Sequence, residues 1–77
     1  MLTPEAQRAA RALLGWGVRE LAAEAGVAWT TISQFENGRP LRGATAAKIV
    51  AALTAQGIEL VADDERTGAL MVYARRK

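Results

Sequence analysis

Apolar residues follow a helical period along most of the chain, up to about residue 56. They recur three or four positions apart in four segments, each of which would bury one face against the others. Thr3 and Pro4 suit the start of the first segment, because threonine caps a helix and proline is favoured in its first turn. The pattern predicts helices over residues 4–14, 18–25 and 28–36, and a fourth from 44 or 45 to 56.

Glycine and asparagine separate these segments. Gly15 and Gly57 follow the first and the fourth, and Asn37 with Gly38 follows the third, where a residue that tolerates positive φ can end a helix. Gly26 predicts a sharp turn between the second and third segments. Four short helices joined by short loops predict a compact bundle.

The pattern changes after Gly57 to a period of two. Ile58, Leu60 and Ala62 occupy alternate positions, and a polar stretch then separates them from the apolar residues 69–73. This arrangement predicts a β-hairpin that closes around residues 63–68. A lone hairpin is marginal in water, so we expect it to pair with the hairpin of a second copy, in a homodimer interface built on Leu60, Leu70 and Val72.

The predicted fold class is therefore mainly α, a four-helix bundle followed by a C-terminal β-hairpin. Residues 1–57 are expected to form the helical domain, and residues 58–77 a dimerisation extension with a basic tail.

The helix predicted over 28–36 has two chemically different faces. Ile32 and Phe35 would anchor it from behind, and the small Ala22 would let the preceding helix approach closely. The opposite face carries short or planar groups without an acid, and such groups can contact base edges in a DNA major groove. These residues are Trp29, Thr30, Ser33 and Gln34.

The segment from Val18 to Gly38, V-R-E-L-A-A-E-A-G-V-A-W-T-T-I-S-Q-F-E-N-G, resembles the lambda-repressor/Cro-like (XRE-type) helix-turn-helix family. The resemblance extends over the four helices, about two thirds of the chain, and its most specific parts are E-L-A before A-G-V and then I-S-Q-F-E-N-G. It implies a lambda-repressor-like bundle that binds double-stranded DNA. The chain departs from the family at Gly17, Val18 and Ala28, where hydroxyl caps and a glutamine are usual.

The resemblance also implies roles for single residues. Trp29, Thr30 and Gln34 occupy the family's base-contacting positions, and Glu36 occupies that of an acid which pairs with an arginine of the first helix, here Arg11. By its chemistry, Gln34 can bond an adenine edge and Thr30 can contact a thymine methyl. For Trp29, contact with DNA sugar-phosphate or thymine methyls and packing against the first or second helix both stay open. Trp16 is expected in the core.

Phosphate contacts are expected from the loop after the third helix and from the start of the second, where backbone N–H groups are free. The side chains expected to make them are Arg19, Asn37, Arg39 and Arg42. Net charge adds little support for DNA binding, because the total is only +2 and the halves before and after Gly43 each carry five basic and four acidic residues.

Composition excludes several classes of function. The 77 residues are 51% hydrophobic and 23% charged, as in a soluble globular domain. The sequence has no cysteine and no histidine, which excludes disulfides, thiolate and imidazole metal sites, and the usual Ser-His or Cys-His nucleophile pairs. We expect no enzymatic activity, cofactor, metal or small-molecule ligand. No apolar run approaches the roughly 18 residues that span a bilayer, so we expect a cytoplasmic protein without a membrane partner.

The sequence thus predicts a transcriptional regulator, most simply a repressor that binds an inverted repeat in the major groove as a homodimer. The alternative is an antitoxin-like or adaptor module that binds another protein through its hairpin and contacts DNA secondarily. Activation instead of repression stays open, because the fold serves both.

Overall fold

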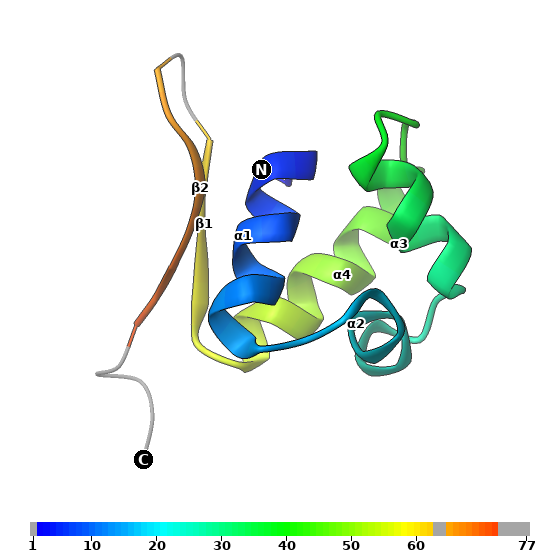
Figure 1. Ribbon diagram of the computed structural model, residues 1–77, viewed down its shortest axis with the longest axis horizontal. Helices are drawn as coiled ribbons and strands as arrows, with labels where there is room; N and C mark the ends of the chain where they lie inside the picture. The colour runs from blue at the N-terminus through cyan, green and yellow to red at the C-terminus, as the bar shows by residue number, and fades with distance from the viewer. Residues whose placement is uncertain (1, 63–64, 73–77) are drawn as a thin grey trace.

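Four α-helices precede a two-stranded antiparallel hairpin in the computed structural model, which describes residues 2–62 and 65–72 (Figure 1). The helices are α1 (Pro4–Leu14), α2 (Val18–Ala25), α3 (Trp29–Glu36) and α4 (Gly43–Ala55), and the strands are β1 (Ile58–Ala62) and β2 (Thr67–Met71). This confirms the fold class that the sequence predicts.

The helix ends follow from local chemistry. Thr3 Oγ1 accepts a hydrogen bond from the Ala6 N–H and caps α1, while Gly26 ends α2 with a φ of 73° that an L side chain rarely adopts. Ala28 was expected inside the third helix but is its N-cap, without a side-chain hydrogen bond. The fourth helix begins earlier than predicted, at Gly43, and ends one residue earlier, at Ala55.

The core lies where the helices and the hairpin meet. Ala10, Leu21, Ile32, Ile49, Leu53 and Ile58 are each at most 1% exposed and form one cluster. Trp16 packs against this cluster, as the sequence predicts. Because Ile58 begins the hairpin and belongs to this cluster, the hairpin contributes to the core of the helices.

The two strands form a sheet with one inward and one outward face. Ile58 lies opposite Met71, Leu60 opposite Ala69, and Glu59 opposite Leu70. Since β2 ends at Met71, the prediction that the second strand runs over 69–73 was two residues late, and its last residue lies outside the described part of the chain. Leu60 is half-buried and packs against the core from the inward face, and its place in a dimer interface stays a prediction.

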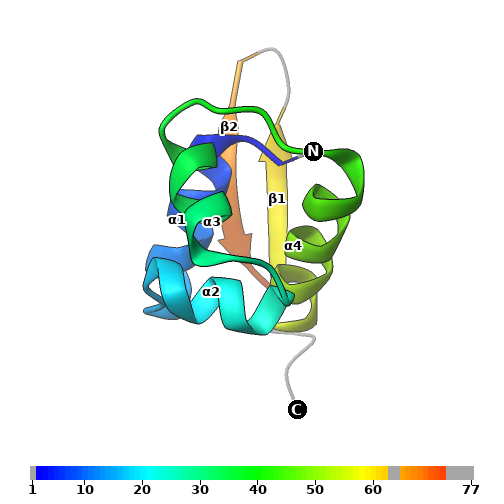
Figure 2. The same cartoon turned by 90° about the vertical axis from the view of Figure 1, so that its right-hand side faces the viewer.

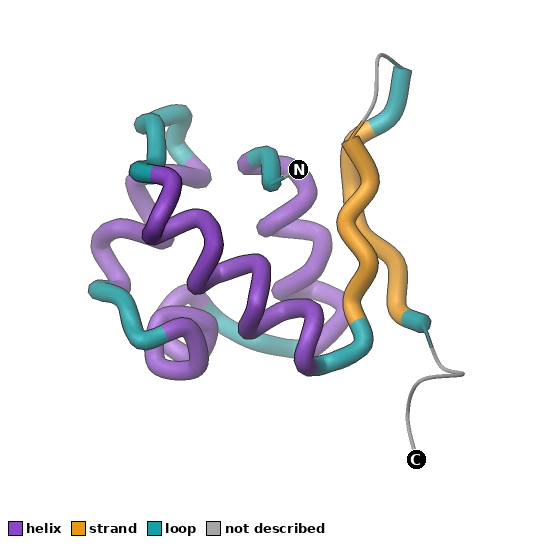
Figure 3. The backbone as a smooth tube through the Cα atoms, turned by 180° about the vertical axis from the view of Figure 1, so that it is seen from behind, coloured by secondary structure: helices purple, strands orange, loops and turns teal. Residues whose placement is uncertain are grey.

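The hairpin and α3 lie at opposite ends of the molecule. The hairpin covers α1 on the side away from α3 (Figure 1), and a view turned by 90° shows α2 and α3 in front with both strands behind (Figure 2). Seen from the back, α4 runs diagonally across the bundle and leads directly into β1 (Figure 3). The outer face of α3 is therefore not covered by the hairpin.

Candidate nucleic-acid interface

The turn between α2 and α3 is closed by backbone hydrogen bonds and by apolar packing. The N–H groups of Gly26 and Val27 both donate to the Ala22 carbonyl, at 2.9 and 3.0 Å. Leu21 and Ala22 on α2 are buried against α3, which contributes Ile32 and Phe35, exposed by 0% and 8%. α3 is thus fixed from behind by its two large apolar residues.

The outer face of α3 carries the four residues that the sequence singles out. Trp29, Thr30 and Gln34 are exposed and Ser33 is half-buried. Their spacing places all four on one side of the helix, and none of them is charged. The structure therefore offers a row of neutral hydrogen-bonding groups beside one large aromatic ring, on a helix held rigidly along its other side.

The sequence pattern of the helix-turn-helix family matches residues 7–55, which include most of α1 and all of α2, α3 and α4. The chain belongs to this family, of the lambda-repressor type. None of the curated proteins matches the chain. Helix-turn-helix domains of this type bind DNA, so the protein is a DNA-binding protein, and α3 is the helix that such domains place in the major groove.

Exposed polar and basic side chains surround this face of the helix-turn-helix. Asn37 is the C-cap of α3, Arg39 lies in the loop after it, and Arg42 is the N-cap of α4; all three are exposed. Arg19, on the first turn of α2, is also exposed and approaches α3 from the other side. These are the residues expected from the sequence to contact phosphates, and the structure leaves them accessible for that role.

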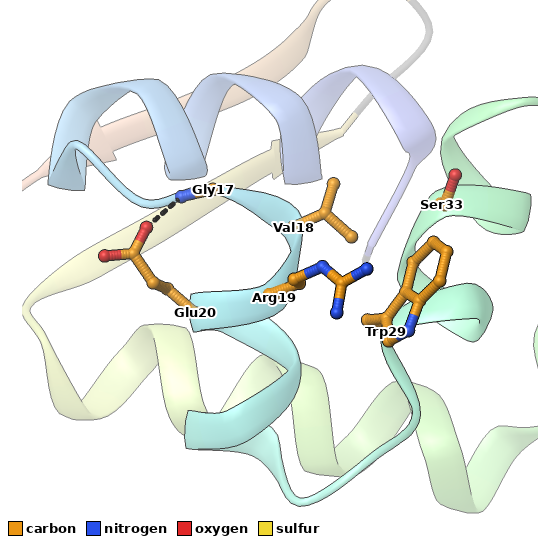
Figure 4. A pocket seen from close by; sticks show the side chains of 6 residues that line it. All are labelled: Gly17, Val18, Arg19, Glu20, Trp29 and Ser33. Atoms are coloured by element: carbon orange, nitrogen blue, oxygen red, sulfur yellow. Dashed lines mark hydrogen bonds between the residues drawn. The ribbon is translucent and has the colours of Figure 1, made fainter.

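The start of α2 differs from the sequence expectation. Glu20 turns back and accepts a hydrogen bond from the Gly17 N–H, which caps the helix in place of the missing hydroxyl residue (Figure 4). A carboxylate at this position repels a phosphate. Backbone donation to DNA from the start of α2 is therefore weakened, and Arg19 and the loop after α3 become the main candidates for phosphate contacts.

Arg11 and Glu36 form the ion pair that the resemblance implies. Arg11 Nη2 lies 2.7 Å from Glu36 Oε1 and Arg11 Nε lies 2.8 Å from Oε2, a two-pronged geometry. A third hydrogen bond joins Arg11 Nη1 to the Trp16 carbonyl at 3.0 Å. The pair fastens the C-terminal end of α3 to α1 and to the loop before α2, and so holds the orientation of the recognition helix.

Gln7 is a member of this network that sequence reasoning missed. Its side chain is completely buried and donates from Nε2 to Glu36 Oε2 at 2.8 Å and to the Ile32 carbonyl at 3.3 Å. The signal in the sequence was its position four residues before Arg11, on the same face of the first helix. Arg8 adds a hydrogen bond to the Glu36 carbonyl at 2.8 Å.

The environment of Glu36 favours its charged form. Burial raises the pKa of this carboxyl, but hydrogen bonds from Arg11 and Gln7 and the charges of Arg11 and Arg8 outweigh burial, so the pKa lies below its ordinary value of 4.5. The hydrogen bond to Glu36 raises the pKa of Arg11 against the opposing effect of burial. The pair therefore stays ionised at neutral pH.

In the part of the chain that the structure describes, no helix is both long and apolar enough to cross a membrane. Within residues 2–62 and 65–72, no three acidic side chains come together as a set of metal ligands.

Proposed function

We propose that this helix-turn-helix protein represses transcription by binding an inverted repeat in double-stranded DNA as a homodimer, with α3 of each copy in the major groove. The observation that carries the proposal is the outer face of α3, where Thr30 and Gln34 are exposed while Ile32 and Phe35 are buried. Occupation of a promoter by such a protein blocks access of the polymerase.

Each residue on the proposed interface has a role set by its chemistry. Gln34 has a donor and an acceptor that match the adenine edge, and the Thr30 methyl matches the thymine methyl. Ser33 and Trp29 complete the base-contacting set. Arg39 and Arg42 neutralise phosphates and set the register of α3 on the duplex, with Asn37 and Arg19 at the borders of the interface.

Selection from a random duplex library, followed by binding measurements over a range of salt concentrations, tests this proposal. We expect an enriched palindromic sequence and an affinity that falls steeply with salt, because phosphate contacts release counterions.

Arg42→Ala is expected to weaken binding to the selected and to unrelated duplexes alike, and to lower the slope of log affinity against log salt by about one. Lys48→Ala, at an exposed position in the middle of α4, serves as the matched control. It should leave the affinity for either duplex and the salt slope unchanged. If no duplex of any sequence bound at low salt, the proposal would be contradicted.

The homodimer is proposed to form at the edges of the strands. Leu70 is 43% exposed and lies opposite Glu59, and Val72, which follows β2, is half-buried. The hairpin itself lies at the end of the molecule away from α3 (Figure 1). If two outward faces packed together, the α3 helices of the copies would point in opposite directions. Pairing along a strand edge keeps both α3 helices on one side of a joined sheet, which one face of a duplex requires.

Leu70→Lys is expected to weaken dimerisation up to about five-fold, because in the joined sheet it replaces a cross-strand apolar contact worth up to about 1 kcal/mol. The variant should still fold, since the new ammonium faces Glu59 across the hairpin. Leu13→Lys is the matched control, because Leu13 is 46% exposed on α1. Sedimentation equilibrium measures the effect, and a Leu70→Lys protein that dimerises like the wild type would exclude this interface. Truncation before the hairpin is unsuitable as a test, because it removes Ile58 from the core.

A further inference from the structure

A groove with mainly apolar walls lies between the start of α2 and the first two turns of α3. Its volume is about 450 Å³, and Figure 4 shows the side chains that converge on it from the two helices. The lining residues are Gly17, Val18, Arg19, Glu20, Trp29 and Ser33. The groove opens beside the outer face of α3, so a duplex bound to that face would meet it.

Apolar surface and one acid offset the single cation among the residues that line this groove, Arg19, whose guanidinium lies over the Trp29 ring. Val18 and the Trp29 ring supply apolar surface, and the Glu20 carboxylate adds a negative charge beside the Gly17 N–H that it bonds. Trp29 leaves 44% of its surface exposed, although tryptophan is usually covered. An exposed tryptophan that lines an apolar groove beside a DNA-binding helix indicates contact with a nonpolar group of the DNA.

The nonpolar group that a base displays in the major groove is the 5-methyl of a pyrimidine, which thymine carries and cytosine lacks unless it is methylated. A methyl group packs favourably against an apolar surface and forms no hydrogen bond. The wall formed by Val18 and Trp29 supplies such a surface.

Arg19 holds the Trp29 ring in place. Its guanidinium carbon lies 4.4 Å from the centre of the ring, within the range of a cation–π contact between α2 and α3. Because the two residues come from different helices, the contact fixes the indole against the groove instead of leaving it free to change rotamer. Arg19 thus acts on the groove through Trp29.

We propose that Val18 and Trp29 form a seat for the 5-methyl group of a thymine or 5-methylcytosine in the bound site, and that Arg19 is the positioning residue that keeps the indole in this seat. The inference rests on the proposed function, since it requires DNA on the outer face of α3. It adds a determinant of specificity that lies on α2 as well as on α3.

Deoxyuridine scanning of the selected duplex tests the proposal, because deoxyuridine differs from thymidine only by the absence of the methyl group. For the wild type, we expect replacement of one particular thymine, in one half-site at a time, to lower affinity about four-fold, as the loss of one buried methyl predicts. Replacing the same thymine by cytosine and then by 5-methylcytosine should show recovery with the methylated base. In Trp29→Ala, the deoxyuridine duplex and the thymidine duplex should bind equally well at that position.

Three variants separate the roles. Thr30→Ser is the matched control, because Thr30 also faces the groove of the DNA and can contact a different thymine; it should keep the methyl effect assigned to Trp29. Arg19→Gln should reduce the methyl effect without changing thermal unfolding, and Arg19→Lys, which keeps a cation for the ring, should retain it. A methyl effect that persists at the same thymine in Trp29→Ala, or that is absent at every thymine of an enriched site, overturns the inference while the proposed function stands. Absence of any enriched duplex overturns the proposed function itself.

Discussion

Replacing Glu36 by alanine is expected to lower the free energy of unfolding by about 3–5 kcal/mol, the usual loss when one partner of a largely buried ion pair is removed. The Glu36 side chain is 9% exposed and accepts hydrogen bonds from Arg11 and Gln7. Alanine would leave the guanidinium, 18% exposed, without its partner, and the buried Gln7 amide with only the Ile32 carbonyl. For a domain of this size, the loss is a large fraction of the total stability.

Urea denaturation of three variants measures this effect. Glu36→Gln keeps an acceptor for Arg11 and Gln7, so it should lose less than Glu36→Ala. Glu24→Ala, at an exposed position on α2, is the control and should change the free energy of unfolding by no more than about 0.5 kcal/mol. Equal stability of Glu36→Ala and the control would show that the network contributes nothing.

The same carboxyl should make stability depend on pH. Because folding lowers the pKa of Glu36, its contribution is present above the ordinary value of 4.5 and is lost as the pH falls from there through the lower pKa of the folded protein. Glu36→Gln cannot titrate at this position, so its stability should fall less steeply below pH 4.5 than that of the wild type. An equally steep fall in both proteins would assign the acid sensitivity to other carboxyl groups.

Replacing Gln34 by alanine is expected to cost about 1–3 kcal/mol in binding to the selected site, or roughly 5- to 150-fold in affinity. A neutral amide that bonds a base edge contributes to sequence discrimination and little to general attraction, so binding to an unrelated duplex should hardly change. The ratio of specific to nonspecific affinity should therefore fall by the full amount.

Fluorescence anisotropy with a labelled selected duplex and a labelled scrambled duplex measures both affinities. Gln56→Ala is the matched control, because Gln56 is an exposed glutamine at the C-cap of α4. A parallel loss on both duplexes would mean that Gln34 acts on the phosphate backbone, and no loss on either would remove it from the interface.

The sequence predicts local features of this fold well and distant ones less well. The bounds of α1 and α2 were correct because Pro4 and the glycines Gly15 and Gly26 mark their ends directly. The helical period alone placed the start of the third helix one residue early, at Ala28, although the resemblance puts a cap residue at that position. The second strand was misplaced by two residues because the polar stretch between the two strands contains no tight two-residue turn to fix the register.

In the candidate site, too, local features could be predicted from the sequence and contacts between distant residues could not. The outer face of α3 could be predicted because Ile32 and Phe35 define its buried side by their spacing alone. The hydrogen-bond partner of Gln7 could not be predicted in this way, because the carboxylate that its amide bonds lies 29 residues away. The contact between Arg19 and Trp29 and the inward direction of Leu60 also depend on how elements pack, which spacing along one element does not reveal.

The central claim is that the outer face of α3, and not the hairpin, enters the major groove of the DNA. Titration of the ¹⁵N-labelled protein with the selected duplex, followed through the backbone amide resonances, tests it most directly. The account predicts the largest shifts at Thr30, Ser33 and Gln34, smaller ones near Arg39 and Arg42, and none on the strands of the hairpin. Shifts centred on Glu59 and Leu70, with the α3 resonances unchanged, would contradict it.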